Sequence, residues 1–237
     1  MAAALRGRTA ANAACATEWR GGVVMRELPK VGAAVAIPLI WSNWLLPRSG
    51  RGLRGRTVAN AVFATGYAVA LRGRPNWWSS RGLTCGLASG AVVLSGYGAA
   101  LAIPAVRARL SGFADRGPGV ATAEWVAVHI PVGTVYSEEL IFRATLDPLL
   151  DNAFGPRLGS ALGAAIFGLW HIRPARAAGD DIATTVIATG FGGLVLGRLG
   201  RRATSATAPA LFHFALNAGG ALAPRLARSL PRPPHSA

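Results

Sequence analysis

Long charge-free runs of apolar residues alternate with short arginine-rich segments along the chain. The runs cover residues 31–47, 57–71, 82–106, 158–172, 182–197 and 203–224, and a further apolar block near 117–150 is interrupted by charges. A helix needs roughly 20 residues to cross about 30 Å of hydrocarbon, so the shortest runs require tilt or a thinned bilayer. The runs lack period-2 alternation, which favours helices over a β-barrel. We predict an all-α, polytopic transmembrane helical bundle of about seven spans, with six or eight as the alternatives.

The two ends of the chain differ from this apolar region. Residues 1–28 hold no uninterrupted apolar core of the length that a signal peptide needs, because arginines and glutamates divide them. Residues 225–237 combine arginines with prolines. We therefore expect a disordered basic arm at 1–28, a transmembrane helical domain at 29–224 and a disordered tail at 225–237.

The composition supports a membrane protein. The 237 residues are 51% hydrophobic and only 15% charged, whereas soluble domains contain roughly 25% charged residues. A formal net charge of +15 can indicate nucleic-acid binding, but the arginines are dispersed between apolar runs. We therefore expect a multi-pass protein of the cell membrane that contacts anionic lipids and does not bind nucleic acid. Basic residues divide almost evenly between the two sets of loops, so the positive-inside rule assigns no orientation.

Ionisable residues inside apolar segments are rare and usually functional, and the segment 137–143 contains three of them. Glu139 and Arg143 are four residues apart, so on a helix they can form an ion pair on one face. Glu138 lies on a neighbouring face without an obvious partner. Ser137 could cap a helix that begins there, or one helix could run through it. A solvated helix end at the membrane surface is the alternative to a functional site.

Two other apolar segments each contain a histidine next to a second informative residue. Phe167 and His171 share one helical face near the end of their run, where a histidine could equally reach toward the membrane surface. His213 and Asn217 share one face in the middle of a longer run. Hydrogen bonding between helices is the alternative role for that pair.

Two further patterns carry less information. His129 and Glu124 lie five residues apart, a spacing that does not align them on an α-helix, and we leave both out of the predicted site. Glycines recur at four-residue spacing at 86 and 90, at 159 and 163, and at 193 and 197. This spacing permits close contact between membrane helices, although it also recurs by chance in a chain with 30 glycines.

Together the three polar elements resemble the CPBP family of intramembrane proteases, the superfamily of CAAX proteases and bacteriocin-processing enzymes. The family motifs occur in order as Glu138-Glu139-x3-Arg143, Phe167-x3-His171 and His213-x3-Asn217, within residues 119–220. The resemblance implies a helical bundle around a conical cavity, and an endopeptidase that cleaves membrane-associated or lipidated peptides. Bacterial members generally lack prenylated CAAX substrates, so for a bacterial chain it favours peptide processing or signalling.

The resemblance also implies roles for the motif residues. Glu138 and His171 would activate the attacking water, and His213 and Asn217 would bind the oxyanion, which typically contributes about 2.7–4 kcal/mol per donor. The supporting positions would be Glu139, Arg143 and Phe167. Glu138, His171 and His213 would also form a His2Glu zinc set with one open position, so zinc is the alternative to the favoured metal-independent mechanism.

Two other functions stay open at the level of sequence. Buried histidine and glutamate side chains could form the proton relay of a transporter, although no inverted repeat is visible. The same pocket could bind a peptide without cleaving it, as in a catalytically silent scaffold or immunity protein. The complete motifs favour an enzyme, because a chain that had lost catalysis would be free to lose them.

Overall fold

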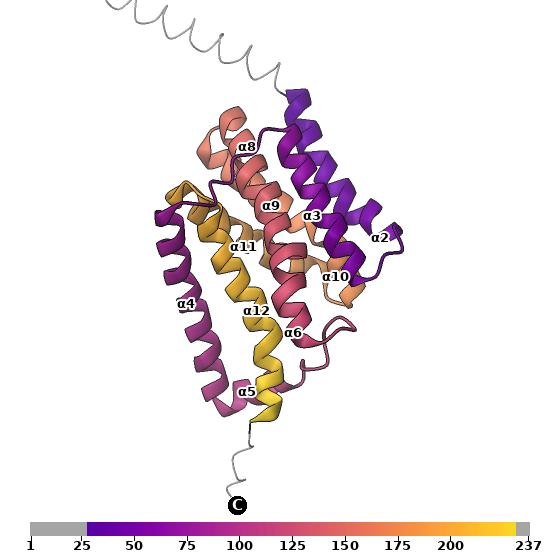
Figure 1. Cartoon of the computed structure of the whole chain (residues 1–237), viewed down its shortest axis with the longest axis vertical. Helices are drawn as coiled ribbons and strands as arrows, with labels where there is room; N and C mark the ends of the chain where they lie inside the picture. The colour runs from indigo at the N-terminus through magenta and orange to yellow at the C-terminus, as the bar shows by residue number, and fades with distance from the viewer. Residues whose placement is uncertain (1–27, 231–237) are drawn as a thin grey trace, which may run out of the picture.

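The computed structural model describes residues 28–230, which form helices joined by short loops and contain no strand (Figure 1). Helical residues 28–40 continue into η1 (Trp41–Leu45) and α2 (Leu46–Arg48), and are followed by α3 (Leu53–Ala70), α4 (Ser80–Ala102) and α5 (Pro104–Ser111). One unbroken helix over 122–154, the long helix, comprises α6 (Thr122–Glu124), η2 (Trp125–Tyr136), α7 (Ser137–Ile141), η3 (Phe142–Leu146) and α8 (Asp147–Phe154). The chain ends with α9 (Pro156–Trp170), α10 (Ile172–Ala178), α11 (Ile182–Ala203) and α12 (Thr207–Ser229).

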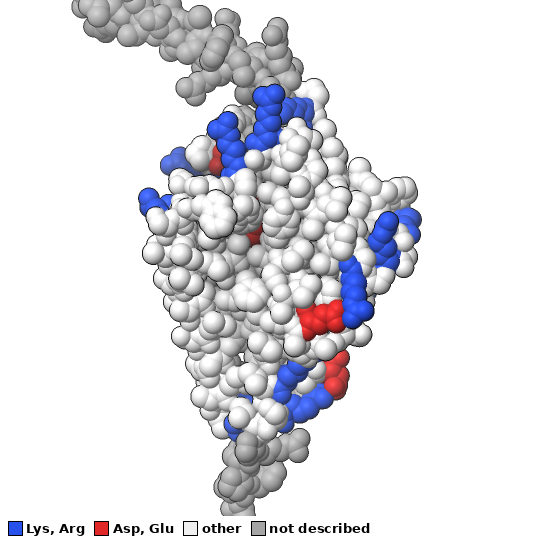
Figure 2. Space-filling view, viewed as in Figure 1, with Lys and Arg blue, Asp and Glu red and all other residues white. Residues whose placement is uncertain are grey.

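The predicted all-α class is confirmed, and a long helical segment covers each apolar block of the sequence. Two of these helices, α4 and α11, are long and apolar enough to cross a membrane by themselves, each with a mean hydropathy of 1.5. The total of seven spans stays a prediction. In the space-filling view, most charged side chains lie toward the margins of one face, and the area between them is uncharged except for a small recessed patch of acidic atoms (Figure 2). A largely uncharged area of this kind suits contact with hydrocarbon.

The long helix runs through the first motif without a break. Ser137 has helical backbone angles (φ −64°, ψ −47°), and its hydroxyl donates to the carbonyl of Val132 at 2.9 Å. Of the two arrangements that the sequence allowed, the continuous helix is therefore right. The half before Ser137, η2, is π-helical and contains Pro131. Proline has no N–H and its ring clashes with the carbonyl four residues earlier in an α-helix, a conflict that the wider π turn relieves.

Short polar signals set the other helix boundaries. Ser79 and Asp181 cap α4 and α11, because their side chains accept hydrogen bonds from the backbone N–H of Gly82 at 2.9 Å and of Thr184 at 2.8 Å. Hydrogen bonds from the side chain and backbone of Thr184 lower the pKa of the Asp181 carboxyl. Gly155 separates α8 from α9 with φ +80°, a conformation that favours glycine.

The boundaries of the helical domain differ slightly from expectation. Residues 1–27 of the expected arm lie outside the described residues, and residue 28 is already helical. At the other end, α12 continues through Pro224 to Ser229, so the first part of the expected tail is helical. In this extension Arg228 forms an ion pair with Asp115 at 2.6 Å, which links the last turn of α12 to the loop after α5. Residues 231–237 lie outside the described residues.

Close helix contacts bring the three motif elements together. The α12 helix packs along α4 and also contacts η2 and α11, while α9 packs against α8 and α11 (Figure 1). Several repeated glycines lie at these contacts: a Cβ at Gly86 would be 2.7 Å from Leu211 Cδ1, and one at Gly193 would be 3.0 Å from Phe167 Cβ. Of the two interpretations that the sequence left open for these glycines, close helix contact therefore holds at Gly86 and Gly193.

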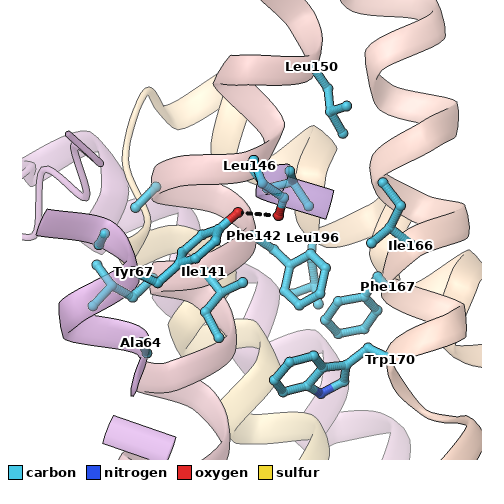
Figure 3. Packing of buried hydrophobic residues seen from close by; sticks show 14 of the residues in the cluster. Ala64, Tyr67, Ile141, Phe142, Leu146, Leu150, Ile166, Phe167, Trp170 and Leu196 are labelled. Carbon is cyan, nitrogen blue, oxygen red and sulfur yellow. Dashed lines mark hydrogen bonds between the residues drawn. The ribbon is translucent and has the colours of Figure 1, made fainter. Parts of the chain in front are cut away.

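An aromatic cluster fixes the long helix against α9. The ring of Phe142 lies edge-on to Phe167 and Trp170, with centroid distances of 4.9 and 5.7 Å (Figure 3). Nearby, the hydroxyl of Tyr67 donates to the carbonyl of Ala34 at 2.7 Å, which joins α3 to the first helix. Because Phe142 follows the first motif's glutamates in the long helix and contacts Phe167 and Trp170 of α9, this packing holds the first motif next to the second.

Candidate active site

Glu138 lies in a buried polar cluster formed by the long helix, α9 and α12. One carboxylate oxygen, Oε1, accepts a hydrogen bond from Trp170 Nε1 at 3.1 Å. The other, Oε2, has no hydrogen-bond partner among residues 28–230. It lies 4.0 Å from His171 Nε2 and 3.9 Å from His213 Nε2. One oxygen of the carboxylate is thus held in place, while the other faces two imidazole nitrogens.

These two distances suit a small bridging molecule. Separations of 3.9 and 4.0 Å are too long for direct hydrogen bonds between Glu138 and either histidine. A water at normal hydrogen-bond length from Glu138 Oε2 and His171 Nε2 would subtend an angle of roughly 90–95° between them. The separation of these two atoms therefore matches one bridging water that both groups would polarise.

The hydrogen bonds of His171 determine which of its nitrogens faces Glu138 as an acceptor. Its Nδ1 lies 2.8 Å from the carbonyl oxygen of Phe167. A carbonyl only accepts, so Nδ1 carries the proton and Nε2 of the neutral ring presents a lone pair. The Phe167 ring lies 4.9 Å from the imidazole, between centroids, and restricts its rotation. The His171 side chain is 20% exposed, so this edge of the cluster is open to small molecules.

Two residues of the first motif, Glu139 and Arg143, fix the orientation of His213. Its Nδ1 lies 2.7 Å from Oε1 of Glu139, a fully buried residue, and the carboxylate accepts this hydrogen bond. Oε2 of the same carboxylate lies 3.2 Å from Arg143 Nε, so the ion pair predicted from the four-residue spacing is present. The Arg143 guanidinium also lies over the Phe167 ring, at 4.7 Å from its centroid. Glu139 thus joins Arg143 to His213 and fixes the plane of the imidazole.

Asn217 lies one turn beyond His213 on α12. Its Nδ2 is buried and has no hydrogen-bond partner among the described residues. A buried amide that lacks a partner carries a desolvation penalty of about 1–3 kcal/mol. This donor is therefore available for a bound group that accepts hydrogen bonds.

Trp170 is a site residue that the sequence prediction missed. It is 4% exposed, and its N–H is the only hydrogen-bond donor to the Glu138 carboxylate among residues 28–230. A buried tryptophan usually requires a partner for its N–H. Its position directly before His171 in an apolar segment could therefore have indicated a tryptophan that donates a hydrogen bond within the site. The sequence does not show which acceptor the N–H would reach.

The geometry does not fit a zinc site as it stands. Ligand atoms at about 2.0–2.1 Å from a tetrahedral zinc ion lie about 3.3–3.4 Å apart. The separations from Glu138 Oε2 to His171 and His213 are larger, at 4.0 and 3.9 Å. Within residues 28–230, no group of three or more His, Cys, Asp and Glu side chains is arranged to hold a metal ion.

A separate polar cluster contains the two residues that were left out of the predicted site. Nε2 of His129 lies 3.1 Å from Glu124 Oε1, and its Nδ1 lies 2.7 Å from Thr57 Oγ1. Glu124 also forms an ion pair with Arg54 at 2.7 Å. The expectation that Glu124 and His129 would not align was wrong, because this part of the helix is π-helical and brings residues five apart onto one face. The cluster attaches η2 to α3.

Comparison with known proteins agrees with this geometry. Residues 121–219 match a family model described as type II CAAX prenyl endopeptidase, Rce1-like. The matched segment contains all three motifs and every residue of the Glu138 cluster. No curated protein and no solved structure matches the chain. The match to the family model confirms the resemblance seen in the three motifs: residues 121–219 of the chain are similar to the Rce1-like family of type II CAAX prenyl endopeptidases.

Proposed function

We propose that this chain is an intramembrane endopeptidase that hydrolyses peptide bonds of membrane-associated or lipidated peptides. The observation that carries the proposal is the free Oε2 of Glu138, which lies 4.0 Å from His171 Nε2 and 3.9 Å from His213 Nε2 in a buried cluster. The match of residues 121–219 to the Rce1-like endopeptidase family supports hydrolysis of a peptide bond as the reaction.

Glu138 is suited to act as the general base. Its Oε1 is held by Trp170, which leaves Oε2 to accept a proton from a water that His171 Nε2 also holds. The water oxygen attacks the peptide carbonyl carbon, and its proton passes to Glu138. Glu138 then returns that proton to the leaving nitrogen as the C–N bond breaks. General acid–base catalysis of this kind typically contributes about 10²–10⁴-fold.

His213 and Asn217 are suited to bind the oxyanion that forms on the carbonyl oxygen. Nδ1–H of His213 is already donated to Glu139, so a second donation from Nε2 requires the protonated ring. The Glu139 carboxylate stabilises that positive charge. The unpaired Nδ2 of Asn217 supplies a second donor. Each such donor typically contributes about 2.7–4 kcal/mol to transition-state stabilisation.

The surroundings of the cluster favour a substrate that arrives within the membrane. Many large apolar side chains of the helices are exposed, among them Val62, Leu87, Val92, Ile187 and Phe191. Figure 2 shows a small recessed patch of acidic atoms within a largely uncharged part of one face. A peptide anchored in the bilayer could therefore reach a carboxylate without leaving the hydrocarbon region.

Cleavage of a membrane-anchored peptide library by the purified, reconstituted protein tests this proposal. We expect wild type to cleave members of the library, and Glu138→Gln to lose essentially all turnover while it stays folded. Glu124→Gln is the matched control, because it removes an acid from the same long helix but from the cluster that contacts α3. We expect that variant to retain activity.

Two results would contradict the proposal. Full turnover in Glu138→Gln would show that this carboxylate does not activate the water. A folded wild-type protein that binds library peptides without cleaving any of them would favour a catalytically silent scaffold.

A further inference from the structure

A row of charged side chains continues from the candidate site along the long helix. Glu139, Arg143, Asp147 and Asp151 follow one another at four-residue spacing and therefore share one face. Asp147 Oδ2 lies 3.5 Å from Arg143 Nη1 and 3.6 Å from Nη1 of Arg201, which belongs to α11. Arg201 also donates to both carboxylate oxygens of Asp151, at 2.7 and 2.9 Å.

We call this row the charge ladder, and its members are His213, Glu139, Arg143, Asp147, Arg201 and Asp151. Acidic and basic groups alternate along it, so each inner member has an opposite charge on both sides. The row begins at the imidazole that faces Glu138 and ends at partly exposed groups, since the side chains of Arg201 and Asp151 are 26% and 23% exposed.

The position of Arg143 depends on its charged neighbours. Its side chain is only 2% exposed, and none of its three guanidinium nitrogens has a hydrogen-bond partner of good geometry among the described residues. Attraction to Glu139 on one side and to Asp147 on the other therefore places it. Removing one partner of a buried pair leaves a charge without compensation, so loss of Asp147 would shift Arg143 toward Glu139.

Glycines on two neighbouring helices leave room for the ladder. A Cβ at Gly163 of α9 would clash with Asp147 Oδ1, and a Cβ at Gly159 would clash with Asp151 Oδ1. On α11, a Cβ at Gly197 would lie 2.6 Å from Arg201 Nη1 and 3.2 Å from Asp147 Oδ2. The glycine spacings that allow helices to approach here also shape the space that holds two carboxylates.

A cavity of about 230 Å³ lies beside the outer part of the ladder. Its lining includes Arg143, Asp147, Asp151 and Arg201, together with Arg74 at the exposed side. Water in this cavity can therefore reach the outer charges. The inner members, Glu139 and His213, are absent from its lining and contact the candidate site instead.

We propose that Asp147 and Arg201 are positioning residues of the candidate site, which act through Arg143 and Glu139 on the orientation of His213. This inference rests on the proposed function, because it assigns the ladder a role in that reaction. Neither residue belongs to the three motifs. Arg201 lies on α11, a helix that contributes no motif residue. Through Arg201, a fourth helix would therefore help to set the geometry of the reaction centre.

Kinetics of Asp147→Asn and Arg201→Gln with a cleaved library peptide form the first part of the test. A small misplacement of a catalytic group typically costs up to about 10²-fold in rate, so we expect kcat to fall on the order of 10- to 100-fold with KM little changed. Arg201→Lys should recover part of the loss. Arg198→Gln, which removes an exposed arginine from the same helix, is the control and should match wild type.

Side-chain ¹⁵N NMR of the histidines in detergent micelles tests the same inference without any substrate. We expect Asp147→Asn and Arg201→Gln to shift the ring signals of His213. The signals of His129 should stay unchanged, because Thr57 and Glu124 hold that ring. This readout separates the ladder from the protease proposal, since it needs no turnover.

Glycine substitutions keep the test decisive where removal of a buried charge prevents folding. Gly163→Ala displaces Asp147 without changing any charge, whereas Gly192→Ala on α11 meets nothing within 4 Å. We expect the first to shift the His213 signals and the second to leave them as in wild type. Unchanged His213 signals in Asp147→Asn, Arg201→Gln and Gly163→Ala would overturn the inference.

Discussion

The carboxylate of Glu139 accepts a hydrogen bond from Nδ1 of His213 at 2.7 Å, although the two residues are 74 positions apart. This contact joins the first motif to the third and leaves Nε2 of His213 facing Glu138. It therefore makes the second glutamate of the motif an orienting group for the proposed oxyanion donor, while the first glutamate serves as the base.

A double-mutant cycle measures this coupling. We expect His213→Ala to lower kcat by roughly 10²–10³-fold, as is usual on removal of an oxyanion donor. Glu139→Gln should lower it less, because the ring remains. Since Glu139 acts through His213, the double variant should be no slower than His213→Ala alone. Fully multiplicative losses in kcat would show that the two residues act independently.

Trp170→Phe tests how far the indole N–H fixes Glu138. The substitution removes the donor at 3.1 Å and keeps an aromatic ring against Phe142. An unpaired buried carboxylate oxygen carries a penalty of about 1–3 kcal/mol, so we expect kcat to drop about tenfold or more with folding preserved. Trp77→Phe, in the ring stack with Tyr136, is the control. Equal activity of both variants would show that the Trp170 N–H does not help to position Glu138 for the reaction.

Metal dependence is tested by elemental analysis and chelation. Because the separations of 3.9 and 4.0 Å around Glu138 Oε2 do not fit a tetrahedral zinc ion, we expect activity to survive chelator treatment without stoichiometric zinc in the purified protein. Loss of turnover on chelation, with recovery on addition of zinc, would favour Glu138, His171 and His213 as ligands in a rearranged site.

Membrane attachment is tested by fractionation. The two helices α4 and α11 are long and apolar enough to cross a bilayer, and the Rce1-like family that residues 121–219 match is membrane-embedded. We expect the protein to sediment with membranes, to resist carbonate extraction and to require detergent for solubility. Release by carbonate as a soluble monomer would contradict the proposed intramembrane reaction.

The cap of α11 predicts a pH-dependent contribution to stability. Hydrogen bonds from Thr184 lower the pKa of Asp181 below its usual 3.8. The carboxylate therefore stabilises the folded state above pH 3.8, and this contribution is lost as the pH falls through the lowered value. We expect Asp181→Ala to unfold at a lower temperature than wild type near pH 7, by circular dichroism in detergent. The difference should shrink toward pH 3, and a constant difference would contradict this account.

The sequence by itself determined the helical class, the positions of the long helices and the motif residues. Charge-free runs of this length can satisfy their backbone polar groups in a membrane only as helices, and spacings of four residues align side chains within one helix. Both are local properties. For this reason the Glu139–Arg143 pair and the contact between Phe167 and His171 were predictable from sequence.

Only the tertiary structure decided which helices meet and with which face. The donor that Trp170 supplies to Glu138, the contact between Glu139 and His213, and the link from Asp147 to Arg201 each join different helices. Local spacing leaves the rotation and depth of each helix undetermined. The π-helical turn that aligns Glu124 with His129 escaped the sequence for a related reason: a repeat based on the α-helix cannot show where the backbone adopts a wider turn.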